Sequence, residues 1–191
     1  MRIIDASILA CAVVLNGCAS TPPASAPQPT NTSRAISLIL EKDEGELRTW
    51  RGWPGHPKPG ETFLLKVDPE HGGSSHLVFG TETEAPGDAI GTHEHPHADE
   101  ILFLQTGTSR VQVGNMVRVV HGGATVFIPA GTWVSLTNIG HDAVNLAFIF
   151  SAPGFERFIR AESVRPGEKN TPVSKTEDEE IQKRLDVVIY K

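Results

Sequence analysis

The chain has 191 residues, of which 39% are hydrophobic and 6% aromatic, and its formal net charge is −6 at pH 7. This length gives a single domain enough interior for a hydrophobic core. The mild, unclustered acidity and the scarcity of aromatic residues argue against a nucleic-acid partner and against attraction to an anionic membrane surface.

Residues 1–17 have the pattern of an export signal. The basic residue Arg2 precedes an apolar run that is too short to span a bilayer but is as long as a signal-peptide core. The run ends in Leu-Asn-Gly-Cys at 15–18, which resembles a bacterial lipoprotein box. This resemblance implies that Cys18 is lipidated and, because Ser20 follows, that the protein is anchored in the outer membrane and faces the periplasm. An ordinary cleaved signal and a secreted protein are the alternative.

A tether is predicted at residues 18–35. Its sequence is rich in Pro, Ser, Thr and Ala and has too little apolar surface to order itself, so it is expected to be extended. The two cysteines of the chain are Cys11 and Cys18. The rest of the chain therefore has no disulfide and depends on its core, or on its core and a metal.

From residue 36 to 165 the pattern predicts an all-β domain. Many short apolar runs separated by regular turns indicate an antiparallel sandwich or barrel. The predicted strands lie at 36–40, 63–67, 76–82, 100–105, 109–115, 116–120, 124–129, 133–138 and 143–151. Val111, Val113, Val117 and Val119 alternate with polar or basic residues, which predicts strands with one buried face.

Two short helices are predicted near the C-terminus. Residues 154–163 carry apolar side chains at helical spacing and predict a helix packed on the barrel. Residues 176–185 predict a second helix, because Thr176 and Glu179 form a capping-box pair. This helix belongs to a C-terminal helical extension, residues 166–191, and is expected to cover a sheet face.

Candidate metal ligands lie in the stretch GTHEHPHADE. His93 and His95 are two residues apart and point to the same face of a strand, while Glu100 opens the next strand, so the three side chains can converge on one ion. Two imidazoles and a carboxylate favour Fe, Mn, Ni, Cu or Zn over Ca or Mg. The flanking acids Glu94 and Asp99 are either solvated charges or acceptors for a ligand imidazole N–H.

The spacing of these residues resembles the two sequence motifs of the cupin family. The first motif has the form G-x5-H-x-H-x4-E-x6-G and is met by Gly87, His93, His95, Glu100 and Gly107. The second has the form G-x5-P-x-G-x2-H-x3-N and is met by Gly123, Pro129, Gly131 and Asn138, with Val134 in place of its histidine. The resemblance extends over about residues 60–160. It implies an antiparallel cupin β-barrel, also called a double-stranded β-helix or jelly roll, with a metal inside its mouth.

Val134 leaves two interpretations open, because valine cannot ligate a metal. In the first, His93, His95 and Glu100 hold the ion and leave positions for water or substrate, with the ligand types of the non-haem Fe(II) facial triad. In the second, the site has weakened and the barrel binds an organic ligand without a metal. His97 lies in a turn and is expected to be exposed. His76 is expected in the core or at the rim. The remaining histidines are expected at the surface: His56, His71, His121 and His141.

Two functions are therefore considered. The first is a metal-dependent enzyme of the bacterial envelope, a dioxygenase of the quercetinase-like sort, with isomerase or cyclase chemistry as an equal option. The resemblance implies that Glu100 is both ligand and proton acceptor. Leu102, Leu104, Val134 and Leu136 would line an apolar pocket for a small organic molecule. The second function is a non-catalytic cupin lipoprotein that binds a small molecule or metal. Because cupins are often dimers, a homodimer is a further expectation.

Overall fold

A computed structural model describes residues 35–52 and 61–191. The described residues all belong to one compact unit. The expected signal, the lipidation site Cys18 and almost all of the tether lie outside the described residues. Those expectations therefore stay predictions.

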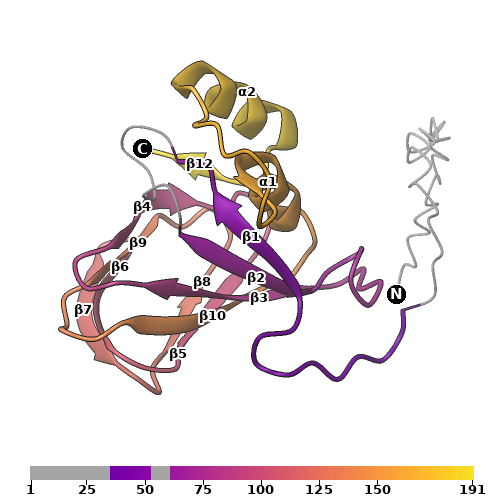
Figure 1. The fold of residues 1–191 in the computed structure, drawn as a ribbon. Helices are drawn as coiled ribbons and strands as arrows, with labels where there is room; N and C mark the ends of the chain where they lie inside the picture. The colour runs from indigo at the N-terminus through magenta and orange to yellow at the C-terminus, as the bar shows by residue number, and fades with distance from the viewer. Residues whose placement is uncertain (1–34, 53–60) are drawn as a thin grey trace, which may run out of the picture. The chain divides into compact units, whose positions relative to one another are not determined.

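The described residues form two antiparallel sheets, one of seven strands and one of five (Figure 1). The strand order is β11-β1-β2-β3-β10-β5-β8 in the larger sheet and β12-β4-β9-β6-β7 in the smaller. The elements are β1 Glu46–Trp50, β2 Thr62–Val67, β3 Val78–Glu84, β4 Ala89–Glu94, β5 Glu100–Leu104, β6 Thr108–Val113, β7 Met116–His121, β8 Thr125–Ile128, β9 Val134–Asn138, β10 Val144–Phe150, α1 Phe155–Glu162, β11 Ser163–Val164, α2 Lys175–Leu185 and β12 Ile189–Tyr190. The expected all-β jelly-roll barrel with short C-terminal helices is confirmed.

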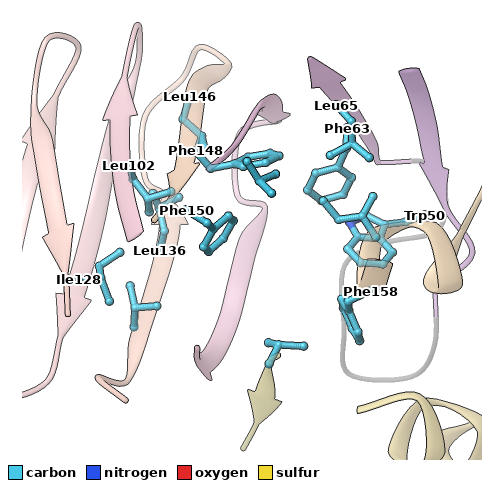
Figure 2. Close-up of a cluster of buried hydrophobic side chains, with 14 of the residues drawn as sticks. Trp50, Phe63, Leu65, Leu102, Ile128, Leu136, Leu146, Phe148, Phe150 and Phe158 are labelled. Atoms are coloured by element: carbon cyan, nitrogen blue, oxygen red, sulfur yellow. The ribbon is translucent and has the colours of Figure 1, made fainter. Parts of the chain in front are cut away.

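The hydrophobic core fills the space between the sheets and reaches the first helix. Figure 2 shows Leu102 and Leu136, which come from different sheets, near Phe148 and Phe150 of β10. Trp50 packs edge-on against Phe63 and Phe158, so β1, β2 and α1 share one aromatic cluster. Each buried side chain of this size contributes roughly 1.5–3 kcal/mol to folding, which makes burial the main source of stability for this domain.

Two glycines make this packing possible. Gly107 has φ of 86° in the turn between β5 and β6, and an added Cβ would lie 2.6 Å from Cγ2 of Val144. At Gly80 of β3 an added Cβ would lie 2.3 Å from Cζ of Phe148. Any other residue at Gly80 would therefore displace an aromatic ring of the core.

Two expectations about the strands are wrong. Residues 36–40 are extended but are not part of either sheet, and Ile39 is 97% exposed. The turn that follows, at residues 42–43, is held by Lys66, which donates hydrogen bonds to the carbonyls of Glu41 and Glu44. In β7, Val117 and Val119 face outward although they alternate with polar residues, because the register places them opposite the exposed Gln112 and Arg110.

The C-terminal region also contains strands that the sequence pattern missed. The short strand β11 pairs with β1, and β12 pairs with β4. Helix α1 lies within the predicted range, but α2 is capped by Ser174, whose hydroxyl accepts from the Glu177 N–H, so the predicted cap at Thr176 is wrong. Among the described residues, neither helix has the length and hydropathy needed to cross a lipid bilayer.

Candidate metal centre

Three ligand-type side chains meet inside the barrel. His93 is on β4, His95 follows that strand directly, and Glu100 is the first residue of β5. All three are buried, and each offers a ligand atom that lies within 4.8 Å of the others. We call His93, His95 and Glu100 the site triad. The structure thus brings together the three residues that the first sequence motif singles out.

The turn between β4 and β5 sets this arrangement. Pro96 and His97 form the turn, and Asp99 ties it to neighbouring segments by accepting from the Ala130 N–H and donating its own N–H to the Ser151 hydroxyl. The carbonyl of His95 also accepts from Gly131 at 2.8 Å. Asp99 therefore stabilises the turn and not an imidazole.

Backbone carbonyls orient both imidazoles. The Nδ1 atom of His93 lies 2.8 Å from the Gly91 carbonyl, and Nδ1 of His95 lies 3.0 Å from the Val187 carbonyl. A carbonyl can only accept, so Nδ1 carries the proton and Nε2 keeps its lone pair, as a metal ligand requires. The expectation that Glu94 or Asp99 would accept these hydrogen bonds is wrong.

Burial disfavours charge on the three members of the triad, and two of their polar atoms lack hydrogen bonds within the part of the chain that the structure describes. Nε2 of His95 and Oε2 of Glu100 are 3.6 Å apart, and neither has a hydrogen-bond partner among the described residues. Burial lowers the pKa of His93, lowers the pKa of His95 to about 3 and raises the pKa of Glu100 to about 8. Buried polar atoms without partners destabilise a fold, so these two need an explanation. A divalent ion between them would satisfy both atoms and favour the carboxylate form of Glu100.

Aromatic and aliphatic side chains surround the triad. The His95 ring packs against Phe150 and Phe155, with centroid distances of 4.6 and 4.8 Å. The residues expected to line an apolar pocket are all buried in the adjoining core: Leu102, Leu104, Val134 and Leu136. Val134 is the direct partner of His93 between β9 and β4, so it lies beside the triad and adds no ligand.

The remaining described histidines lie elsewhere. His97 is mostly exposed and pairs with Asp186 at 2.9 Å, as expected for a turn residue. His76, His121 and His141 are exposed, and His56 lies outside the described residues. His71 is not a simple surface residue, because its Nδ1 is 3.3 Å from a carboxylate oxygen of the fully buried Asp68.

His71 belongs to a second cluster of ligand-type residues, which also contains Glu46 and Asp68. An arginine occupies this cluster: Arg160 of α1 donates to Glu46 at 2.7 Å and to Asp68 at 2.6 Å. Burial alone would raise the pKa values of Glu46 and Asp68, but hydrogen bonds and the positive charge of Arg160 hold them below their ordinary values. We call Glu46, Asp68, His71 and Arg160 the Arg160 cluster. It is satisfied without a metal.

Sequence reasoning missed two contributors to the site triad, Val187 and Tyr190. The first supplies the carbonyl beside His95, and the second packs its ring on His93 with a centroid distance of 5.4 Å. Both come from the last turn and strand of the chain. A two-residue strand leaves no periodic signal in the sequence, so only the spatial pairing reveals it.

Comparison with known proteins agrees with this architecture. Residues 80–150 match the family model of the cupin domain, and this segment contains the site triad and Val134. Taken together, the barrel fold and the matched segment support a place in the cupin superfamily.

Individual relatives are more distant. The uncharacterized protein YrkC of Bacillus subtilis (strain 168) is 32% identical over 73 residues, which covers 35% of this chain and 39% of that protein. The chain therefore spans well under half of that relative's length. Among solved structures, a predicted oxalate decarboxylase from Thermotoga maritima has a TM-score of 0.53 and 17% identity over 61% of this chain and 100% of its own. KdgF from Halomonas sp. has a TM-score of 0.46 and 17% identity over 52% of this chain and 86% of its own.

Proposed function

We propose that the domain binds one divalent transition metal ion through the site triad and uses it in chemistry on a small organic molecule. One observation carries this proposal: Nε2 of His95 and Oε2 of Glu100 lie 3.6 Å apart in the barrel interior without a hydrogen-bond partner among the described residues. Two imidazoles and a carboxylate suit Fe, Mn, Ni, Cu or Zn. Three protein ligands also leave positions open for a substrate.

The reaction class that we propose is a metal-dependent dioxygenation, with isomerase or cyclase chemistry on the same site as the alternative enzyme. A bound ion would polarise a substrate oxygen or take part in redox chemistry. The chain's own residues bind and orient: Gly91 and Val187 fix the two imidazoles, and Phe150 and Phe155 limit access of water to His95. Glu100 is buried beside His95 and is the carboxylate of the site triad, so it is the candidate acid–base residue.

The interior favours a largely apolar substrate. Phe150 and Phe155 supply aromatic surface next to the triad. Glu82 lies on the same face of β3 as the buried Val78, and burial and the neighbouring carboxyl groups of Glu84 and Glu100 raise its pKa, which favours its neutral form. The activity named for the Thermotoga relative is not proposed for this chain, because a likeness at 17% identity concerns the fold alone.

A second candidate function is a non-catalytic module that binds a small molecule or a metal. Val134 favours this candidate, because it is 1% exposed beside His93 and cannot complete a set of four protein ligands. The two candidates differ in a measurable way. The enzyme requires a stoichiometric metal, whereas a module that binds an organic ligand in a degenerate site does not.

Metal analysis of the purified protein tests the proposal. After loading with Fe(II), Mn, Ni, Cu or Zn in turn, we expect about one ion per chain for at least one metal. His95→Ala should abolish this binding, while His97→Ala, a matched change at the exposed histidine, should not alter it. Sub-stoichiometric metal with every ion would refute the metalloenzyme. Oxygen uptake with a flavonol or catechol then tests dioxygenation, and unchanged oxygen levels with every loaded form would exclude that reaction for those substrates.

We also propose, on the N-terminal sequence alone, that the domain is exported and anchored in the outer membrane through a lipid on Cys18, with residues 21–33 as the tether. Palmitate labelling of the full chain in a bacterial host tests this. We expect labelling of the native chain and loss of labelling in Cys18→Ala. Equal labelling of both chains would contradict the anchor.

A further inference from the structure

Strand β12 forms one wall of the site triad. In the smaller sheet, Tyr190 of β12 pairs with His93 of β4, and His93 pairs in turn with Val134 of β9. Residues that are direct partners in adjacent strands point to the same face of a sheet. Because His93 and Val134 are buried in the barrel, the Tyr190 side chain also faces the interior. His93 therefore stands between a side chain that cannot ligate, Val134, and an aromatic ring.

The Tyr190 ring packs directly on the imidazole. Its centroid lies 5.4 Å from that of His93 with an interplanar angle of 35°, and 6.0 Å from that of Phe158 in α1. An offset aromatic contact of this kind is favourable beyond the area that it buries and restricts how the smaller ring can rotate. The Gly91 carbonyl accepts a hydrogen bond from one edge of the His93 imidazole, and the Tyr190 ring packs on its face.

The segment that carries Tyr190 is fastened on both sides. Toward β4, Lys191 donates its backbone N–H to the Thr92 carbonyl and places Nζ 4.0 Å from the centre of the Trp133 ring. Toward α2, Tyr190 donates its backbone N–H to Oε1 of Gln182. The same segment supplies the Val187 carbonyl that accepts from His95. Figure 1 shows β12 next to β4 and below α2. One short segment thus contacts both histidines of the triad.

We propose that Tyr190 is a positioning residue of the metal centre, and that β12 and Val187 together hold both histidines of the triad in the orientation that binds metal. This inference rests on the proposed metal binding. It assigns part of the site to residues outside 80–150, the segment that matches the cupin-domain model. It also explains how a centre with three protein ligands keeps a fixed geometry: His93 has no partner ligand on the Val134 side, and its orientation depends on the opposite wall.

Four forms of the full chain test the proposal: the native protein, Tyr190→Leu, Tyr190→Phe and Ile189→Ala. Leucine fills much of the ring's volume but lacks its planar face, whereas phenylalanine keeps the face and removes only the hydroxyl. Ile189 is the matched control, because it is on the same strand, pairs with Glu94 and faces the other side. Thermal unfolding of each form establishes that it is folded.

Two measurements are made on each form. The first is Co(II) affinity together with the visible ligand-field spectrum, which reports the geometry of the bound ion. Outer-sphere partners of metal ligands typically change affinity by 10–100-fold, so Tyr190→Leu should weaken Co(II) binding roughly tenfold and alter the spectrum. Tyr190→Phe and Ile189→Ala should stay within about twofold of the native protein. A native-like affinity and spectrum in Tyr190→Leu would overturn the proposal.

The second measurement uses the metal-free protein and separates this inference from the proposed function. Imidazole nitrogen chemical shifts in a long-range ¹H–¹⁵N spectrum report the tautomer and environment of His93 and His95. Tyr190→Leu should shift the His93 ring nitrogens, and Tyr190→Phe should restore most of the native shifts. If the native protein binds no metal but these shifts appear, metal binding fails while the positioning contact stands. If the His93 shifts are the same in all four forms, the positioning role is refuted whether or not metal binds.

Discussion

The site triad and the Arg160 cluster are built from the same kinds of residue but reach opposite electrostatic states. Both place histidine and carboxylate groups within reach of one ion, and both contain buried acids. In the Arg160 cluster a guanidinium fills the centre and lowers the pKa values of Glu46 and Asp68. In the site triad no cationic side chain does so among the described residues, and burial raises the pKa of Glu100 to about 8.

The difference shows how a charged cluster that stabilises the fold can be distinguished from one that binds a ligand. Residue types and mutual distances alone do not separate the two. What separates them is whether each buried polar atom already has a partner, because an unpartnered buried atom is unfavourable until something binds it. Three changes to the protein or its conditions test this difference between the site triad and the Arg160 cluster.

Arg160→Met should have the largest effect. It leaves the buried carboxylates of Glu46 and Asp68 without their partner, and removing one member of a buried ion pair destabilises a protein by about 3–5 kcal/mol. Because the Arg160 side chain is 16% exposed, we expect a loss of about 3 kcal/mol in the free energy of unfolding, measured by urea denaturation. Arg157→Met on the exposed face of α1 is the control and should change stability by less than about 0.5 kcal/mol. A loss below about 1 kcal/mol would mean that the cluster does not hold α1 to the barrel.

The two clusters should contribute to the stability of the metal-free protein with opposite dependence on pH. Glu100 has a folded pKa of about 8 against an ordinary value of 4.5, so its stabilising contribution is complete below pH 4.5 and is lost as pH rises through about 8. Glu46 and Asp68 have lowered pKa values, so their contribution is present above their ordinary values of 4.5 and 3.8 and is lost as pH falls through the folded values.

Urea unfolding in chelator at pH 7, 7.5 and 8 measures the first of these effects. Burial lowers the pKa values of His93 and His95 from 6.5, and their opposite contribution to stability is nearly complete by pH 7. Each titrating group changes stability by at most about 1.4 kcal/mol per pH unit. Glu162, whose pKa is raised to about 7 by burial and by Asp178, acts in the same direction, so Glu100→Gln should flatten the trend only in part. Saturating metal should remove the Glu100 part of the trend, because the ion holds Glu100 as the carboxylate throughout this range. The same slope in the native protein and in Glu100→Gln would show that Glu100 does not titrate in this range.

Val134→His should have the smallest effect of the three changes, and this effect is on metal affinity. The residue is buried next to His93, and a third imidazole there, as a fourth protein ligand, should tighten metal binding about tenfold, which corresponds to about 1.4 kcal/mol. Zn(II) competition with a chromophoric chelator measures this. Val134→Leu controls for the larger side chain and should not tighten binding. An affinity equal to that of the native chain would mean that the side chain at position 134 does not reach the ion.

The parts of the fold and site that depend on local spacing could be predicted from the sequence. His93, His95 and Glu100 sit on one strand end, one turn and the next strand, so their distances along the chain nearly determine their meeting. Val134 could be placed beside them because the second motif keeps its glycine and proline intervals. Turn glycines such as Gly107 could be identified for the same reason.

The parts of the fold and site that depend on long-range pairing could not be predicted from the sequence. Val117 and Val119 alternate correctly, but a period of two does not say which face is buried, and only the register with β6 places them outward. Arg160 is one charge on a short helix, and nothing near it in sequence indicates its carboxylate partners on other elements. Tyr190 lies in a strand too short to have a pattern.

The hydrogen bond from His95 to Val187 joins residues that are 92 positions apart. Contacts between distant residues form late, because the chain between them must first be ordered. The site triad is therefore complete only when the last segment has docked, because until then His95 lacks the carbonyl that fixes its tautomer. If the domain binds a metal as we propose, the oriented centre depends on the whole length of the barrel and not on the β4–β5 turn alone.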